Sequence, residues 1–194
     1  MPRVNAIVLV LPGGKVRNSR PLRPWHLAAV RMRPFTAALR AVPGLDVTQV
    51  SYSQRGWNGD GSTVRADALA ILQQRLALYP GTPVVLVGHS MGGRVAAHCA
   101  SHPAVRGVVA LAPWWPQDEG ALLGEGQRVH VLHGTADGWT DPAASRRETL
   151  RASTAGVEAS WHPVEGAGHF MLRDASRWHD WTVERVQEIA ALPR

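Results

Sequence analysis

Short apolar runs alternate along this chain with longer segments whose apolar residues recur at helical spacing. The apolar runs are rich in valine, isoleucine and leucine and predict strands at 4–11, 46–51, 83–88, 106–112, 128–133 and 157–163. Helical periodicity lies at about 33–42, 63–79, 91–102, 142–154 and 175–191. Continuously apolar strands fit burial on both faces. The alternation therefore predicts an α/β fold, a three-layer sandwich in which a mostly parallel sheet of about six strands carries helices on both faces.

The chain has the length and composition of one globular domain, which we expect to span residues 1–194. Hydrophobic residues make up 45% and charged residues 19%, and no apolar run approaches the ~20 residues of a membrane helix. The first apolar run is too short and too β-branched for a signal peptide. A single cysteine, Cys99, excludes an internal disulfide framework. We therefore expect no membrane span and a cytoplasmic location.

Arginine carries almost all of the positive charge, because Lys15 is the only lysine in a chain of net charge +6. The arginines are scattered, and their densest stretch, 17–33, is interleaved with prolines rather than arranged along a helix face. We therefore expect no nucleic-acid partner. Arg17, Arg20 and Arg23 follow the first strand, where they would favour an anionic substrate.

The segment Gly88-His89-Ser90-Met91-Gly92 joins a strand run to a helical run and matches G-x-S-x-G. A serine at such a turn is held in a strained conformation that flanking glycines leave room for, and its hydroxyl projects at the carboxyl edge of the sheet. The following helix directs free N–H groups at the same point, where the Met91 amide can bind an oxyanion. The context predicts a nucleophile at Ser90 rather than a glycine-rich turn that holds a serine by chance.

A serine hydroxyl needs a histidine that takes its proton and a carboxylate that holds the histidine. Asp137 lies in a loop directly after the strand 128–133, and His169 lies in a glycine-rich loop after the strand 157–163. Parallel strands end at one edge of a sheet, so we expect both side chains beside Ser90. The order serine, aspartate, histidine is the one found in α/β-hydrolases.

Three motifs give the chain a resemblance to a small α/β-hydrolase: GHSMGG at 88–93, HGTAD at 133–137 and GAGHF at 166–170. The resemblance covers essentially the whole length. It implies a serine hydrolase of esterase type, without cofactor or metal, whose nucleophile, acid and base are Ser90, Asp137 and His169.

Two departures from that family shape the expected architecture. The family's usual first two strands are missing, because the strand before the oxyanion loop begins at residue 4. Only about fifteen residues separate Ala112 from Arg128, where many relatives insert a helical cap. We therefore expect an open site without a lid, in which water competes well with other acceptors.

The second oxyanion donor is expected in the loop LPGGK at 11–15, whose small residues let a backbone approach a ligand. Many relatives have His-Gly at this place, whereas Pro12-Gly13 stands here, and proline has no amide hydrogen to donate. Gly14 is the predicted donor beside Met91, with Gly13 and Lys15 as alternatives.

Tryptophans are numerous after the expected strands, at the edge where open α/β sheets bind ligands. The five in such segments are Trp25, Trp57, Trp114, Trp115 and Trp139. We expect Trp114 and Trp115, together with Trp25, to contact an acyl or aromatic part of the substrate. The alternative is that these rings only pack loops onto the domain.

Several polar residues have simpler interpretations. His98 and His102 have the i, i+4 spacing of a metal pair but lack a third ligand, so we expect no metal site. His89 is expected to orient the serine, and His133 to brace the Asp137 loop. Asp141 is the alternative acid, although its place before proline suits a helix cap.

These features together predict a hydrolase that cleaves an ester-type bond, a carboxylic ester or thioester, of a small and partly apolar substrate through an acyl-enzyme on Ser90. One alternative is a binding protein without activity on a hydrolase scaffold. A cofactor-free perhydrolase or an acyltransferase is the other alternative.

Overall fold

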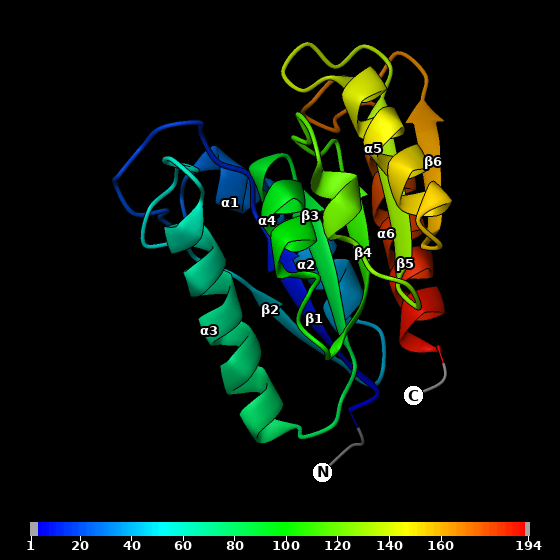
Figure 1. Cartoon of the computed structure of the whole chain (residues 1–194). Coiled ribbons are helices and arrows are strands. Elements are labelled where there is room, and N and C mark those ends of the chain that lie inside the picture. Colours follow the sequence, from blue (N-terminus) through cyan, green and yellow to red (C-terminus); the bar gives the residue numbers. More distant parts are fainter. Residues whose placement is uncertain (1–3, 193–194) are drawn as a thin grey trace.

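The computed structural model describes residues 4–192, which form one six-stranded sheet covered by helices (Figure 1). The strand order is β2-β1-β3-β4-β5-β6, and every neighbouring pair is parallel. The strands are β1 (Ala6–Leu11), β2 (Leu45–Gln49), β3 (Val84–His89), β4 (Val105–Leu111), β5 (Arg128–Gly134) and β6 (Glu158–Val164). The expected α/β sandwich is therefore confirmed.

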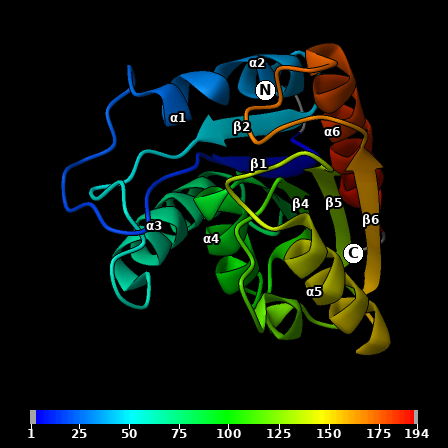
Figure 2. The same ribbon diagram turned by 90° about the horizontal axis from the view of Figure 1, so that it is seen from above.

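The helices lie in two layers, one on each face of the sheet. The helices are α1 (Leu27–Arg31), α2 (Arg33–Arg40), α3 (Ser62–Leu78), α4 (Met91–Cys99), α5 (Pro142–Thr154) and α6 (Ala175–Ala190), with a short 3-10 helix, η1 (Glu119–Leu122). Figure 2 shows α1, α2 and α6 on one side of the sheet and α3, α4 and α5 on the other. Helix α5 begins as expected, because Asp141 accepts a hydrogen bond of 2.8 Å from the Ala143 amide.

The core consists of two clusters that the central strands separate. In β1 every residue is buried, and Ile7 and Leu9 belong to the cluster under α3 and α4. Val8 and Val10 point the other way and pack with α2 and α6. Burial on both faces explains why this strand is continuously apolar rather than alternating in polarity.

The sheet reverses its order of growth between β1 and β3. The chain passes from β1 outward to β2 and then returns to place β3 on the other side of β1. Such a reversal opens a crevice at the carboxyl ends of the two strands, and open α/β sheets bind ligands there. Ser90 directly follows β3 and therefore lies beside the loop that follows β1.

No helical cap covers this edge in the described part of the chain. Between β4 and β5, residues 112–127 contain only η1. None of the helices described here combines the length and the apolarity needed to cross a bilayer.

Candidate active site

Ser90 has the strained backbone expected of a nucleophile at a strand-to-helix turn. Its φ is 56° and its ψ is −120°, a conformation that residues with a Cβ rarely adopt. A Cβ on Gly88 would lie 2.3 Å from the Gly92 carbonyl oxygen, and one on Gly92 would lie 2.0 Å from that of Leu11. The two glycines are therefore needed for the close approach of α4 to β3 and β1.

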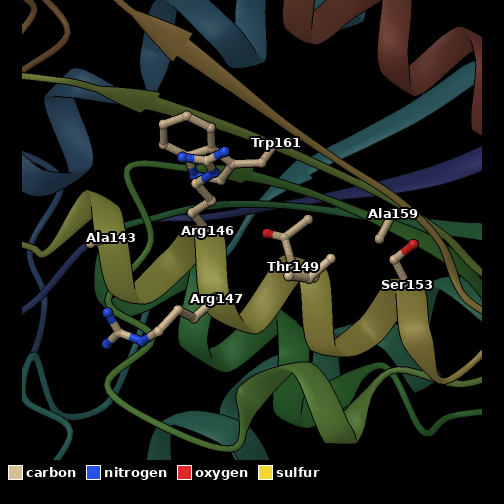
Figure 3. A pocket seen from close by; sticks show the side chains of 8 residues that line it. Ala143, Arg146, Arg147, Thr149, Ser153, Ala159 and Trp161 are labelled. Atoms are coloured by element: carbon tan, nitrogen blue, oxygen red, sulfur yellow. The ribbon is translucent and has the colours of Figure 1, made fainter.

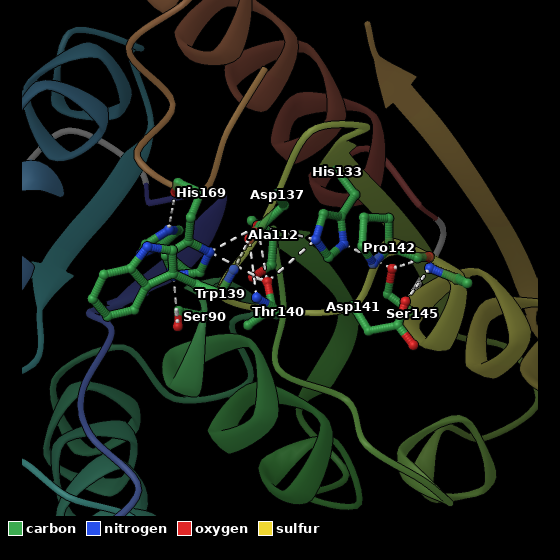
Figure 4. A network of polar contacts seen from close by, with 12 residues as sticks. Ser90, Ala112, His133, Asp137, Trp139, Thr140, Asp141, Pro142, Ser145 and His169 are labelled. Atoms are coloured by element: carbon green, nitrogen blue, oxygen red, sulfur yellow. Dashed lines mark hydrogen bonds and ion pairs between the residues drawn. The ribbon is translucent and has the colours of Figure 1, made fainter. Parts of the chain in front are cut away.

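A line of hydrogen bonds connects the three predicted catalytic side chains (Figure 4). The Nε2 atom of His169 lies 3.0 Å from the Ser90 hydroxyl, and its Nδ1 atom lies 2.8 Å from Oδ2 of Asp137. The His169 side chain is 6% exposed and that of Asp137 is fully buried. Because Nδ1–H donates to the carboxylate, Nε2 is left to accept the serine proton.

The Asp137 carboxylate is held by four further donors. Its Oδ1 accepts from the amides of Trp139 and Thr140, at 2.8 and 2.9 Å. Its Oδ2 lies 2.9 Å from the Thr140 hydroxyl and 3.2 Å from Nε2 of His133. Burial by itself raises the pKa of the Asp137 carboxyl, but hydrogen bonds from the two histidines and the two amides hold that pKa well below its usual value. The carboxylate therefore stays ionised.

His133 braces the aspartate, as the sequence indicated. Its ring is fully buried, and Nδ1 lies 2.8 Å from the hydroxyl of Ser145. The indole N–H of Trp161 donates to that hydroxyl at 3.0 Å. The polar line thus runs from the half-buried Trp161 on β6 to Ser90. Thr140 and Ser145 were not predicted as part of it, because nothing in their spacing distinguishes them from ordinary loop and helix residues.

His89 contacts the histidine loop rather than the serine hydroxyl. Its Nε2 lies 3.0 Å from the His169 carbonyl oxygen, so this nitrogen donates, and the two rings lie 4.7 Å apart. Burial, followed by the charge of His169, lowers the pKa of His89 to about 3. The expectation that His89 orients the serine therefore needs correction: a neutral imidazole at this position holds the backbone of His169.

The predicted oxyanion loop lies against Ser90. Met91 is the first residue of α4, where an amide has no partner within the helix. A Cβ on Gly13 would lie 3.3 Å from the Ser90 Cβ, and one on Gly14 would lie 2.4 Å from Cε of Met91. Lys15 is excluded as a donor, because its amide already donates to the Arg55 carbonyl at 2.9 Å.

The three tryptophans predicted to contact substrate lie in different environments. Trp115 is only 1% exposed and its indole donates to the Gly93 carbonyl, so the structure contradicts substrate contact for it and supports the packing alternative. Trp114 is half-buried against Trp57, and its amide donates to the Ser90 carbonyl. Trp25 is 71% exposed and contacts only the neighbouring His26 ring among the aromatic side chains described.

Two aromatic side chains that the sequence interpretation did not select as substrate contacts lie beside His169, the predicted catalytic histidine. The ring of Trp139 stacks on that of His169, with an interplanar angle of 13° and centroids 6.1 Å apart. Phe170 packs against Trp139 at 5.4 Å and against His169 at 5.9 Å. The only signal for Trp139 was its place after a strand, two residues beyond the acid.

Two surface hollows lie away from these residues. One, of about 500 Å³, lies between α5 and β6 and is lined by Arg146, Leu150 and Trp161 among others (Figure 3). The other, of about 540 Å³, lies beside α2 and β2 and is lined in part by Arg23, Arg33 and Arg40. Neither is lined by Ser90, Asp137 or His169, so the serine lies at an open edge rather than in either hollow.

The sequence matches the family model of the α/β hydrolase fold over residues 40–180. The chain therefore belongs to the α/β-hydrolase family, and residues 4–192 contain no lid. The comparison with curated protein sequences gave no significant match.

Solved structures with low sequence identity share the fold. An α/β serine hydrolase without lid from Xanthomonas campestris is 18% identical, with a TM-score of 0.76 over 99% of this chain and 85% of that one. Est1E from Butyrivibrio proteoclasticus is 11% identical, with a TM-score of 0.73 over 99% and 90%. The esterase Est2 from Thermogutta terrifontis is 19% identical, with a TM-score of 0.69 over 96% and 82%.

Proposed function

We propose that this protein is a serine hydrolase that cleaves carboxylic ester or thioester bonds of small, partly apolar substrates through an acyl-enzyme. The observation that carries the proposal is the continuous hydrogen-bonded line from Asp137 through His169 to a serine on a strained turn. An arrangement of this kind activates a hydroxyl that is otherwise a weak nucleophile.

In this mechanism His169 Nε2 takes the proton of Ser90 as the oxygen attacks the substrate carbonyl. The ionised Asp137 stabilises the imidazolium that forms. The amides of Met91 and of Gly14 or Gly13 bind the oxyanion. His169 then gives its proton to the leaving atom, the oxygen of an ester or the sulfur of a thioester, which departs as its bond to the acyl carbon breaks. A water molecule, deprotonated by the same nitrogen, releases the acid and restores the serine.

The fold and its relatives favour hydrolysis over other chemistry on this scaffold. The open edge without a cap lets water reach the acyl-enzyme, which favours hydrolysis over transfer to another acceptor. Two of the structural neighbours, Est2 and PE8, are esterases by name, and Est2 was solved with propionate bound. Est1E was solved with ferulic acid bound. Ester cleavage is therefore the reaction to test first.

We predict that Ser90→Ala lowers kcat for 4-nitrophenyl acetate by about 10⁴-fold or more, because the nucleophile is lost while binding is kept. A fluorophosphonate probe is expected to label the unaltered protein at Ser90 and to leave the variant unlabelled. Ser101→Ala, in an exposed position just beyond α4, is the matched control and should behave like the unaltered protein.

Retention of most of the activity in Ser90→Ala would reject the assignment of the nucleophile. An unaltered protein that is neither labelled nor active on any ester or thioester would favour the binding-protein alternative. Analysis of products with peroxide or with an added alcohol or amine present separates hydrolysis from perhydrolysis and acyl transfer.

A further inference from the structure

Trp139 and Phe170 form an aromatic rim at the mouth of the site. Trp139 is 74% exposed and Phe170 is 40% exposed, although both pack against a buried histidine. Large apolar side chains that stay open to solvent beside reactive groups are typical of surfaces that bind a ligand. The two rings, tilted by 55° to one another, therefore leave apolar surface open to solvent beside His169.

A cation lies on this rim. The guanidinium carbon of Arg31, at the end of α1, lies 4.3 Å from the centre of the Phe170 ring. Arg31 is half-buried, and burial lowers the pKa of its guanidinium. The charge of Arg31 also acts on His89, the residue before Ser90. Burial is the largest cause of the lowered pKa of His89, the charge of His169 is the next, and the charge of Arg31 lowers that pKa further.

Arg31 has no anionic partner within residues 4–192, where no carboxylate oxygen lies within 4.0 Å of its guanidinium. Two other half-buried arginines do have one: Arg75 pairs with Asp46, and Arg94 lies 2.7 Å from Glu119. A partly desolvated charge without a counter-ion is costly, and a bound anion would offset that cost.

The position of the rim relative to His169 indicates which part of a substrate it meets. The Nε2 atom of His169 must give its proton to the leaving oxygen, so the leaving group has to lie beside this imidazole. Trp139 stacks on the same imidazole and Phe170 is the next residue along the chain. The alcohol part of the ester therefore meets the rim, whereas the carbonyl oxygen faces the amides of the oxyanion loop.

We infer that the preferred substrates are esters of an aromatic or planar apolar alcohol that bears a carboxylate, with the ring on Trp139 and Phe170 and the carboxylate on Arg31. The inference rests on the proposed ester hydrolysis and names its substrate class. It names a different cation from the sequence expectation for anion recognition, which was Arg17, Arg20 and Arg23; these three are exposed, and Arg23 lines the hollow beside α2.

The experiment compares two acetate esters that differ in one group. In 4-acetoxybenzoate the leaving phenol carries a carboxylate, and in 4-methylphenyl acetate it carries a methyl group. In both, Ser90 takes the acetyl group and the phenol leaves with the proton of His169. Arg31→Gln is expected to lower kcat/KM for the anionic ester by at least about tenfold and for the neutral ester by less than about twofold, because one charge-assisted interaction is lost.

Arg33→Gln is the matched control. Arg33 lies two residues away, carries the same charge and lines the hollow beside α2, so both esters should keep their rates. Arg31→Lys keeps the charge and should restore part of the preference for the anionic ester. Added salt should weaken that preference in the unaltered protein.

The outcomes separate the two proposals. Equal effects of Arg31→Gln on both esters, or equal effects of Arg31→Gln and Arg33→Gln, would overturn the role of Arg31 while ester hydrolysis stands. Absence of turnover of either ester, with no labelling of Ser90 by the fluorophosphonate probe, would overturn the proposed function itself.

Discussion

At the scale of single side chains, the Thr140 hydroxyl contacts four polar groups of the site at once. Its hydroxyl lies within 3.2 Å of the Ala112 carbonyl, of the Asp137 carboxylate and of a nitrogen on each of His133 and His169. One hydroxyl has only one hydrogen to donate, and the shortest of these contacts, 2.9 Å, is to the carboxylate. Thr140 is therefore a positioning residue that orients the acid toward His169.

We predict that Thr140→Val lowers kcat for a 4-nitrophenyl ester by about tenfold with little change in KM, because valine has the shape of threonine without a hydrogen bond to the carboxylate. Thr140→Ser keeps the hydroxyl and should recover most of the rate. A change in KM alone, or equal loss in both variants, would indicate a packing effect instead.

At the scale of elements, the turn between β3 and α4 depends on backbone contact with β1. The Gly92 position faces the Leu11 carbonyl oxygen, which belongs to a central strand and has no freedom to withdraw. The same contact brings the loop after β1 beside the serine. The glycine spacing in the motif is therefore a requirement of packing as well as of chemistry.

Gly92→Ala is expected to reduce the free energy of unfolding by at least about 3 kcal/mol, because its Cβ would overlap backbone atoms. Gly124→Ala is the control, since a Cβ there meets nothing closer than 3.9 Å. Urea unfolding of both variants measures the difference. Equal stabilities would show that the turn tolerates a side chain.

The sequence predicted the central elements of the fold because each has a local signature. All six strands and five of the helices were expected, and the motif spacing placed Ser90, Asp137 and His169 at one edge. Helices α1 and η1 were missed, since segments of five and four residues are too short for a periodic pattern. The stack of Trp139 on His169 and the place of Arg31 on Phe170 depend on contacts between segments far apart in the sequence, which periodicity does not report. Trp115 was misread for the same reason.

For the whole molecule, buried histidines make stability depend on pH. Burial is the main cause that lowers the pKa of His89 to about 3 and that of His130 to about 4. In the unfolded chain the imidazoles of His89 and His130 take up protons near pH 6.5, whereas in the folded chain they remain neutral at that pH. The stability that neutral imidazoles contribute is thus present above pH 6.5 and is lost as pH falls toward 4 and then 3.

We predict that His130→Gln flattens the fall in unfolding free energy between pH 6.5 and pH 4, because one buried site no longer resists protonation. Urea unfolding at several pH values in this interval measures the slope. The groups around His130 that also act on its pKa are unchanged in the variant: Glu188, which raises it, and Arg185, His162 and Arg128, which lower it. His102→Gln, at a half-buried histidine beyond α4, is the control. An unchanged slope in His130→Gln would contradict the prediction.

The exposed indole stacked on His169 also has a spectroscopic consequence. A tryptophan in water fluoresces at longer wavelength than one covered by an apolar molecule, and Trp139 is 74% exposed. An aryl ester seated on this ring would shift the emission to the blue without any turnover. Titration of the Ser90→Ala protein with the ester, followed by its tryptophan emission, would thus give a dissociation constant. The Ser90→Ala protein that also carries Trp139→Phe is the control.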